Sequence, residues 1–364
     1  MSGAAAAGDE IRFACRGELM VVTLNRPQAL NALTLSMCRA LDEGLRAWQA
    51  DPTIGAVLIK GAGERAFCAG GDIRWLYHVL TTQGVAAAVR FYAVEYPMNA
   101  RLHHFGKPWI ALLDGITMGG GVGVSVHGSH RIVTGRTMVA MPETGIGMFP
   151  DVGATFMLPR LPGALGLYLG LTGARLGAAD CLHAGIGTAH VASDRLEALE
   201  AALAETPLRD EPFAAVDGVL ARFRSDPGPA PLAELRPRID ACFGRQSLAA
   251  VLAALADETS GWGAAQAREL AQKSPTSLAV TFRQLCKGAT LDFDSAMRLE
   301  YRLVHRCMAG HDFREGVRAL LIDKDQHPRW CPDRLDDVSD AMVDDYFAPL
   351  PDGELALGQG GAGA

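Results

Sequence analysis

The order of its predicted elements places this chain in the α/β class, with a helical C-terminal part. A predicted strand at residues 18–24 precedes a helix that Thr34 caps, and a second buried strand follows at residues 54–59. This strand–helix–strand order implies a right-handed crossover and therefore a parallel sheet. After about residue 205, prolines interrupt the chain and helical patterns then dominate up to about Phe347.

The composition limits the kinds of partner. The chain has 364 residues, 49% of them hydrophobic, and can bury a large core in one large domain or two unequal ones. Its formal net charge of −7 argues against nucleic acid and against an anionic membrane surface. No apolar run approaches the length of a membrane span. The ten histidines form no spaced ligand set, so we expect no metal site.

The termini and the cysteines bear on localisation and domain organisation. The eight cysteines are scattered without a Cys-x-x-Cys pair, and with no secretory signal we expect reduced thiols. The first ten residues are Ala/Gly-rich and acidic, which predicts a tail rather than a signal or transit peptide. We therefore expect a cytoplasmic protein. The expected segments are a disordered tail at 1–10, an α/β core at 11–205, a helical C-terminal region at 206–347 and a flexible tail at 348–364.

A glycine cluster follows a third predicted strand at residues 110–113. Gly119, Gly120 and Gly121 let the backbone turn tightly and approach a ligand, and residues 122–127 can then form a helix. Unpaired N–H groups at such a helix start, together with the helix dipole, favour an oxygen that gains negative charge. Taken alone, however, the glycines favour a helix start that is needed only for close packing.

Two carboxylates come shortly after the glycines. Glu143 lies in Met-Pro-Glu-Thr-Gly and Asp151 in Phe-Pro-Asp-Val-Gly, with no basic residue between them. Asp151 could simply cap a helix, and Glu143 could be a solvated loop residue. Two acids in an apolar loop can instead hold their pKa values apart, so that one stays ionised while the other carries a proton. Together with the glycine cluster they indicate acyl chemistry.

These segments resemble the crotonase (enoyl-CoA hydratase/isomerase) superfamily, and within it most closely the 3-hydroxyisobutyryl-CoA hydrolases. The shared runs are DGITMGGGVG at 114–123, MPETGIGMFPDVG at 141–153, SPTSL at 274–278, and EYRL with GHDFREGVRALLIDKDQ within 300–326. The resemblance extends from about Leu19 to Phe347. It implies a crotonase-like spiral of ββα units, an acyl-CoA substrate and no separate cofactor, because CoA is part of the substrate. Members of this superfamily often form trimers and hexamers, whereas the hydrolase branch need not, so a homo-oligomer is one possibility and the oligomeric state stays open.

The resemblance also implies roles for individual residues. The N–H groups of Gly71 and Gly120 would hold the thioester carbonyl as an oxyanion hole. Glu143 would attack the carbonyl carbon or act as general base on water, and Asp151 would orient water or the substrate's hydroxyl. Glu95 matches a substrate-contacting acid, although a lone helical glutamate more often lies on a solvated face.

Three functions compete on this evidence: a hydrolase, a hydratase or isomerase, and a non-catalytic binding protein. The expected activity is hydrolysis of 3-hydroxyisobutyryl-CoA to 3-hydroxyisobutyrate and CoA, a step of valine catabolism. Hydratases of the superfamily usually carry a second glutamate where this chain has Gly123, and tend to have glycine where it has Asp151. Both departures favour hydrolysis over hydration, while an isomerase that uses one acid stays open. A non-catalytic CoA-ester-binding protein is the third alternative, because a fold does not by itself fix an activity.

Overall fold

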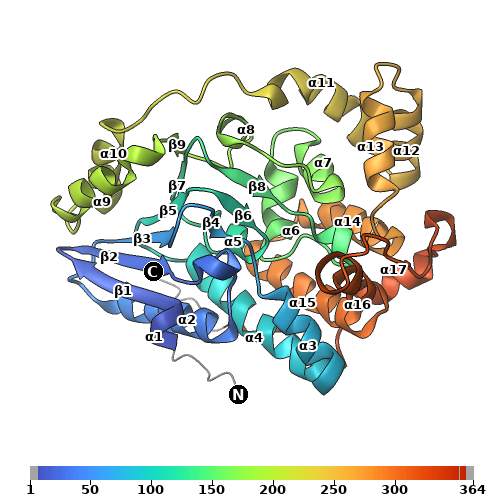
Figure 1. Ribbon diagram of the computed structural model, residues 1–364, viewed down its shortest axis with the longest axis horizontal. Coiled ribbons are helices and arrows are strands. Elements are labelled where there is room, and N and C mark those ends of the chain that lie inside the picture. The colour runs from blue at the N-terminus through green and yellow to red at the C-terminus, as the bar shows by residue number, and fades with distance from the viewer. Residues whose placement is uncertain (1–6, 352, 358–364) are drawn as a thin grey trace.

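The computed structural model describes residues 7–351 and 353–357 and shows an α/β protein built on two sheets (Figure 1). The larger sheet has the strand order β1-β2-β3-β5-β7-β9, and the smaller one has the order β4-β6-β8. β1 is antiparallel to β2, whereas the other pairings of these strands are parallel. The strands are β1 Ile11–Arg16, β2 Leu19–Leu24, β3 Ala56–Gly61, β4 Ala66–Cys68, β5 Trp109–Leu113, β6 Ile116–Met118, β7 His130–Val133, β8 Met138–Ala140 and β9 Ala189–His190.

In the first half of the chain, helices connect most of the strands. After β9, the regular elements that the structure describes are all helices. The helices as far as β9 are α1 Ala7–Glu10, η1 Pro27–Ala29, α2 Leu35–Ala50, α3 Ile73–Gln83, α4 Val85–His103, α5 Gly120–Gly123, η2 Glu143–Ile146, α6 Ala154–Met157, η3 Leu158–Arg160, α7 Leu165–Thr172 and α8 Ala178–His183. The later helices are η4 Ser193–Arg195, α9 Leu196–Ala204, α10 Pro212–Ala221, α11 Pro231–Phe243, α12 Leu248–Asp257, α13 Trp262–Leu270, α14 Pro275–Gly288, α15 Phe293–Ala309, α16 Asp312–Val317, η5 Arg318–Ile322, η6 Leu335–Asp337 and α17 Asp340–Phe347.

The larger sheet is buried on both faces. In β3, Val57 and Ile59 belong to one hydrophobic cluster and Leu58 to another, because neighbouring side chains of a strand point to opposite faces. α9 and α10 contribute Leu199 and Val216 to the second cluster and so cover that face (Figure 1). A strand buried on both faces shows no polar alternation, which explains the continuous apolar run in the sequence.

The predicted fold class is confirmed, and so are the elements on which it depended. The predicted strands at 18–24 and 54–59 correspond to β2 and β3, which pair in parallel. The side-chain oxygen of Thr34 accepts a hydrogen bond from the backbone N of Met37 at 3.2 Å, and α2 begins at the next residue after this cap.

Two elements differ from the sequence-based expectation. β1 was not predicted, because it is an edge strand whose residues after Ile11 are exposed and so lack a buried, alternating pattern. The helix expected at 122–127 is instead the single turn α5, which begins two residues earlier. The hydroxyl of Ser125 donates to the carbonyl oxygen of Gly121 at 2.7 Å, a local bond that competes with continuation of a helix.

Parts of both predicted tails are ordered. Residues 1–6, 352 and 358–364 lie outside the described residues. The last four residues of the expected N-terminal tail form α1, and Glu10 accepts hydrogen bonds from the hydroxyls of Thr34 and Ser36. Near the other end, Leu355 is buried and Glu354 pairs with Arg302 at 2.9 Å. Local composition did not reveal these contacts, because the partners are distant in sequence.

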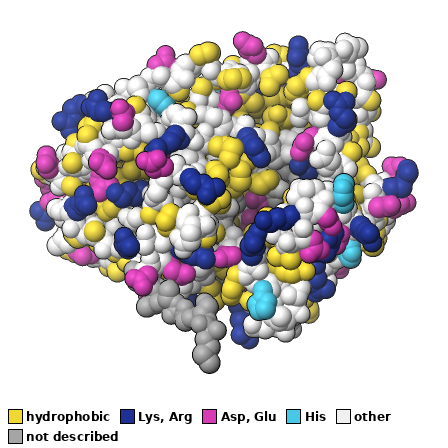
Figure 2. Space-filling model, in the orientation of Figure 1, with side chains coloured by type: hydrophobic (Ala, Val, Ile, Leu, Met, Phe, Trp, Pro, Cys, Tyr) yellow, Lys and Arg dark blue, Asp and Glu magenta, His cyan; other side chains and the backbone are white. Residues whose placement is uncertain are grey.

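Charged side chains of both signs are mixed on the surface. On the face drawn in Figure 2, acidic and basic side chains alternate around hydrophobic ones rather than forming a field of one sign. A net charge of −7 gives an anionic ligand no global attraction, so its binding depends on local groups.

Candidate active site

A cavity of about 280 Å³ brings together the residues that the sequence singled out. It lies where the two glycine turns, the loop after β8 and the η5 segment meet. Its lining residues are Ala69, Gly70, Gly71, Ile73, Phe91, Tyr92, Glu95, Met118, Gly119, Gly120, Pro142, Glu143, Ile146, Met148, Asp151, Leu320 and Leu321. The five predicted site residues, two glycines and three acids, are all among them.

The two glycine turns follow adjacent strands of the smaller sheet. β4 leads to Gly70 and Gly71, and the neighbouring β6 leads to Gly119 and Gly120. A Cβ atom on Gly120 would lie 3.3 Å from the backbone N of Gly71 and 2.6 Å from Oε1 of Glu95. The turns therefore meet closely, and the space between them is one that only glycine leaves open.

Glu143 begins η2 and points into this space. Its side chain is buried, and a Cβ on Gly119 would lie 3.2 Å from Glu143 Oε1. Its other oxygen has no hydrogen-bond partner among the described residues. Burial, and then the nearby Asp151, raise the pKa of Glu143 well above its ordinary value. The alternative of a solvated loop residue is wrong.

Asp151 reaches the same cavity from the following loop. It is buried, and its Oδ2 accepts a hydrogen bond from the hydroxyl of Tyr96 at 2.8 Å. Burial raises the pKa of Asp151 to about 7, although the bond from Tyr96 acts in the opposite direction. The alternative of a side-chain helix cap is wrong, because Gly153 is the N-cap residue of α6 and the carbonyl oxygen of Asp151, not its carboxylate, accepts from the N of Ala154.

Glu95 lies on α4 and is also buried, with only 2% of its surface exposed. Burial raises its pKa well above the ordinary value, and Asp151 and Glu300 raise it further. Its Oε1 has no hydrogen-bond partner among the residues that the structure describes. The interpretation of Glu95 as a solvated helical residue is therefore wrong.

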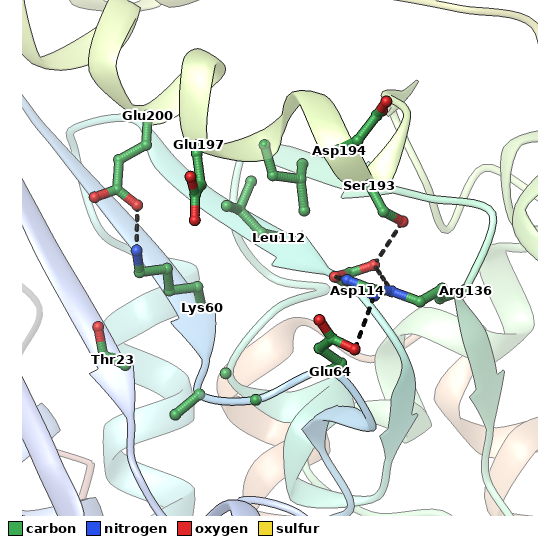
Figure 3. Close-up of a pocket in the computed structure, with 14 residues that line it drawn as sticks. Thr23, Lys60, Glu64, Leu112, Asp114, Arg136, Ser193, Asp194, Glu197 and Glu200 are labelled. Atoms are coloured by element: carbon green, nitrogen blue, oxygen red, sulfur yellow. Dashed lines mark hydrogen bonds and ion pairs between the residues drawn. The ribbon is translucent and has the colours of Figure 1, made fainter.

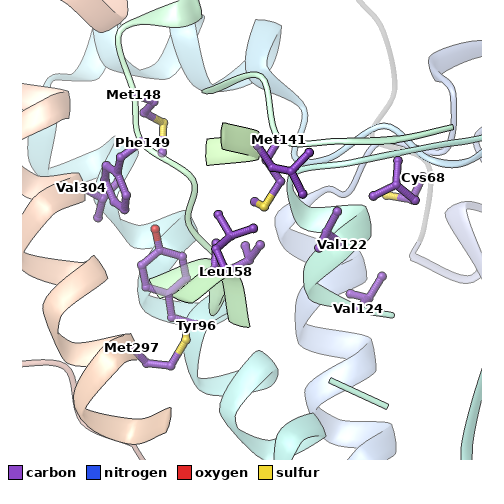
Figure 4. Close-up of a cluster of buried hydrophobic side chains, with 14 of the residues drawn as sticks. Cys68, Tyr96, Val122, Val124, Met141, Met148, Phe149, Leu158, Met297 and Val304 are labelled. Atoms are coloured by element: carbon purple, nitrogen blue, oxygen red, sulfur yellow. The ribbon is translucent and has the colours of Figure 1, made fainter. Parts of the chain in front are cut away.

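Two residues that sequence analysis did not select lie behind the acids. The ring of Tyr96 is fully buried in the hydrophobic cluster that also contains Met297 and Val304 (Figure 4). Glu300, on α15, is fully buried and accepts hydrogen bonds from the backbone N of Gly153 at 2.8 Å and of Thr155 at 2.9 Å.

A sequence signal for Glu300 did exist. Met297, Leu303 and Val304 lie three or four residues away from it and are fully buried, so Glu300 occupies the apolar face of an amphipathic helix. A carboxylate on such a face is rarely buried without specific partners. Burial, and then Asp151, raise the pKa of Glu300 to about 8.

A second cavity, of about 820 Å³, lies between the C-terminal end of β3 and α9 (Figure 3). Part of its charge is paired: Lys60 pairs with Glu200, and Arg136 pairs with Asp114. Asp194 and Glu197 also line it and form no ion pair with the described residues. The smaller cavity differs in that buried carboxyl oxygens of Glu95 and Glu143 in its lining have no hydrogen-bond partner among the described residues. Within the described residues there is no group of three or more His, Cys, Asp or Glu side chains that could hold a metal ion.

Comparison with known proteins identifies the family. The chain belongs to the enoyl-CoA hydratase/isomerase family, whose sequence model matches residues 19–347. It is 45% identical to the mitochondrial 3-hydroxyisobutyryl-CoA hydrolase of Danio rerio, over 96% of this chain and 92% of that protein. It is 41% identical to the human protein of the same name, over 96% of this chain and 91% of the relative.

Solved structures agree with the fold. A carnitinyl-CoA dehydratase from Mycobacterium thermoresistibile superposes with a TM-score of 0.89 at 40% identity, covering 96% of this chain and 99% of that one. An enoyl-CoA hydratase from Rhodobacter sphaeroides gives a TM-score of 0.87 at 38% identity, covering 95% of this chain and 99% of that one. The crotonase-like fold expected from the sequence is therefore confirmed.

The relatives contradict the predicted cytoplasmic localisation, because the hydrolases named above are mitochondrial. That prediction was wrong because reduced cysteines argue only against an oxidising compartment and do not distinguish one reducing compartment from another. In the parts of the chain that the structure describes, no helix has the length and apolar character needed to cross a membrane.

Proposed function

We propose that this chain is an acyl-CoA thioester hydrolase that converts 3-hydroxyisobutyryl-CoA and water to 3-hydroxyisobutyrate and CoA. The observation that carries the proposal is the convergence of Glu143 and Asp151 on the cavity formed by the two glycine turns. Full-length similarity to proteins named as hydrolases of this ester supports it. CoA enters as part of the substrate, and the proposed reaction needs no further cofactor.

The glycine turns would stabilise the developing oxyanion. The backbone N–H groups of Gly71 and Gly120 are the donors, and they act on the carbonyl oxygen as it gains charge in the tetrahedral intermediate. One such preorganised donor is typically worth about 2.7–4 kcal/mol in the barrier. The mostly apolar lining of the cavity strengthens these interactions by excluding water.

Glu143 would carry the chemical step by one of two routes. In the first, a carboxylate oxygen attacks the carbonyl carbon, the carbon–sulfur bond breaks with protonation of the CoA sulfur, and water then hydrolyses the resulting anhydride. In the second, Glu143 takes a proton from a water molecule that attacks the same carbon, and the carbon–sulfur bond then breaks as that proton passes to the CoA sulfur. Both routes require the ionised form of a group whose pKa burial has raised. Rate should therefore fall as the pH drops through that raised pKa.

Glu95 and Asp151 would recognise the 3-hydroxyl group. Glu95 has an unpartnered buried oxygen beside Gly120, and an unpaired buried polar atom is costly unless a ligand satisfies it. Asp151 has one oxygen engaged by Tyr96, which leaves the other available for water or for the hydroxyl. A substrate without this hydroxyl would leave these groups unpaired and should react more slowly.

Hydration is the second candidate, because solved structures at 38–40% identity include an enoyl-CoA hydratase and a carnitinyl-CoA dehydratase. The position of the hydratases' second glutamate argues against it. Gly123 has no side chain to activate water, and a Cβ there would lie 2.7 Å from Cβ of Val152 and 2.9 Å from Nδ2 of Asn99. A glutamate could not enter this space without shifting its neighbours, so the local packing favours hydrolysis.

A panel of CoA esters tests the proposal. Purified protein should release free thiol from 3-hydroxyisobutyryl-CoA faster than it hydrates a crotonyl-type ester, measured separately by thiol reagent and by loss of the enoyl absorbance. Isobutyryl-CoA, which lacks the hydroxyl, is the matched control for recognition. Rapid hydration without thiol release would refute the proposed function, and CoA-ester binding without either reaction would favour a non-catalytic binding protein.

A further inference from the structure

The turn that carries Asp151 has a strained backbone. Val152 has a φ angle of 53°, in the left-handed region that β-branched residues rarely adopt. Gly153 follows with a φ angle of 91°, so two consecutive residues have positive φ. Such conformations persist only where the surrounding structure holds them, and they concentrate at functional sites.

Three side chains from other elements bind this turn through its backbone. Nε2 of His127 lies 2.7 Å from the carbonyl oxygen of Val152, and Nε2 of Gln284 donates to the carbonyl oxygen of Pro150 at 2.6 Å. Glu300 accepts hydrogen bonds from the same turn: each of its two carboxyl oxygens accepts from one backbone N–H group.

Glu300 differs from His127 and Gln284 because burying its carboxyl group costs more free energy. A fully buried carboxyl group is unfavourable unless its hydrogen bonds compensate for the lost water. It accepts from the backbone N–H groups of Gly153 and Thr155, the second and fourth residues after Asp151. It does not line the cavity, so a direct contact with substrate does not explain its presence.

We propose that Glu300 is a positioning residue for Asp151: by holding the N–H groups of Gly153 and Thr155, it fixes the strained turn and thereby directs the Asp151 carboxyl group into the cavity. The inference rests on the proposed function, in which Asp151 orients water or the substrate's hydroxyl. Tyr96 contributes from α4, because its hydroxyl donates a hydrogen bond to Oδ2 of Asp151 at 2.8 Å.

The variants Glu300→Gln and Glu300→Ala test the proposal in a graded way. Glutamine keeps the size and one acceptor oxygen, whereas alanine keeps neither, so kcat should fall about tenfold in the first and on the order of 10²-fold in the second, as for an active-site group displaced by about 1 Å. KM for the ester should stay within about twofold, because Glu300 lies outside the cavity. If the alanine variant does not fold, the glutamine variant alone decides.

Leu303→Ala is the matched control for a merely structural role. Leu303 is fully buried three residues further along α15, so its truncation destabilises the protein without removing a hydrogen bond to the turn. The control should lower the midpoint of thermal unfolding and leave kcat per folded molecule unchanged. Wild-type kcat in folded Glu300→Gln, or a raised KM with unchanged kcat, would overturn the proposal.

A crystal structure of Glu300→Gln separates this proposal from the proposed function. The hydroxyl of Tyr96 and Oδ2 of Asp151, 2.8 Å apart here, should lose hydrogen-bond contact in the variant. An unchanged turn with Asp151 in place would overturn the positioning role, whichever reaction the wild-type protein catalyses. Absence of thiol release by the wild-type protein would instead refute the proposed hydrolysis and leave the structural result valid.

Discussion

Three carboxyl groups share a cavity that has no basic side chain in its described lining. Burial alone raises the pKa of each, and repulsion from Asp151 raises those of Glu95 and Glu143 further. Simultaneous ionisation of all three is therefore unfavourable. Such an arrangement can supply a proton acceptor and a proton donor side by side, as acid–base chemistry at neutral pH requires.

Glu143→Gln should separate chemistry from binding. The change keeps the shape but removes the only group assigned as nucleophile or base, so the single-turnover rate should fall at least 10²–10⁴-fold, the usual worth of acid–base assistance alone. Affinity for a non-hydrolysable CoA analogue should be nearly unchanged. Asp151→Asn keeps hydrogen-bonding capacity and should lose less rate. Near-normal turnover in Glu143→Gln would move the catalytic role to Asp151 or Glu95.

Gly120→Ala should abolish most turnover without unfolding the protein. The new Cβ would lie 2.6 Å from Oε1 of Glu95 and would occupy the space where the thioester carbonyl is proposed to bind. Gly218→Ala is the control, because a Cβ there meets nothing within 4 Å and α10 gains a better helix former. Steady-state kinetics of both variants checks this. Full activity of Gly120→Ala would show that the glycine turn does not face the carbonyl.

At the scale of elements, local patterns located the glycine turns but not the orientation of the helices around them. Glu95 was expected on a helix and lies on α4, yet the sequence pattern did not indicate where its side chain points. The helix is buried on most of its surface, with Phe91, Tyr96 and Leu102 all in the core. A helix of this kind has no clear solvated side against which a polar residue can be oriented.

The C-terminal segment η5 forms one wall of the cavity, which no local pattern indicated. Leu320 and Leu321 line the cavity, whereas the next residue, Ile322, is exposed. The contact joins elements far apart in sequence, and such packing follows from the fold rather than from composition. The resemblance included this segment among the shared runs but assigned no role to these leucines.

Leu321→Ala should weaken substrate binding by removing part of this wall. Loss of apolar contact in a binding pocket is typically worth about 1–3 kcal/mol, so kcat/KM for the ester should fall about tenfold or more, mainly through KM. Ile322→Ala, one residue away but exposed, should have no such effect. Equal KM values for Leu321→Ala and the wild-type protein would show that this wall does not contact substrate.

At the scale of the whole molecule, one hydrophobic cluster joins the α/β part to the later helices. It contains Val57 and Leu41 as well as Leu303 and Phe313. The sequence predicted the change near residue 205 from mixed strands and helices to mainly helices. It could not reveal this shared core, because the contacts join segments that are distant in sequence. Sharing a core couples the site to global stability, since α15 supplies Glu300 while the α/β part supplies Glu95.

The buried acids should make stability depend on pH in a defined window. For Asp151 and Glu300, folding raises the pKa above its unfolded value, to about 7 and about 8, so the folded state binds their protons more tightly. Their contribution to stability is complete below pH about 4 and is lost as pH rises through these values. His127 and His103 have the opposite effect on stability, because folding lowers their pKa values to about 3 and about 4. Their contribution to the free energy of unfolding no longer changes above pH about 6.5, where both groups are neutral in the folded and the unfolded state.

Between pH 7 and 8 the carboxyl groups should therefore dominate the slope. Buried thiols such as those of Cys68 and Cys307, whose pKa folding raises, add to it only as the pH approaches the unfolded thiol value of about 8.5. The free energy of unfolding should fall with rising pH, by up to about 1.4 kcal/mol per pH unit for each proton that the folded state holds in excess. Denaturant titrations at several pH values in this window measure the slope, and Glu300→Gln should reduce it because the amide does not titrate. The exposed Asp336, which pairs only with Arg334 on the surface, provides a control substitution to Asn that should leave the slope unchanged. The opposite result is a free energy of unfolding that stays constant or rises between these pH values, with the same slope in Glu300→Gln. It would mean that these carboxyl groups ionise at lower pH and that a permanently charged Glu300 holds the strained turn.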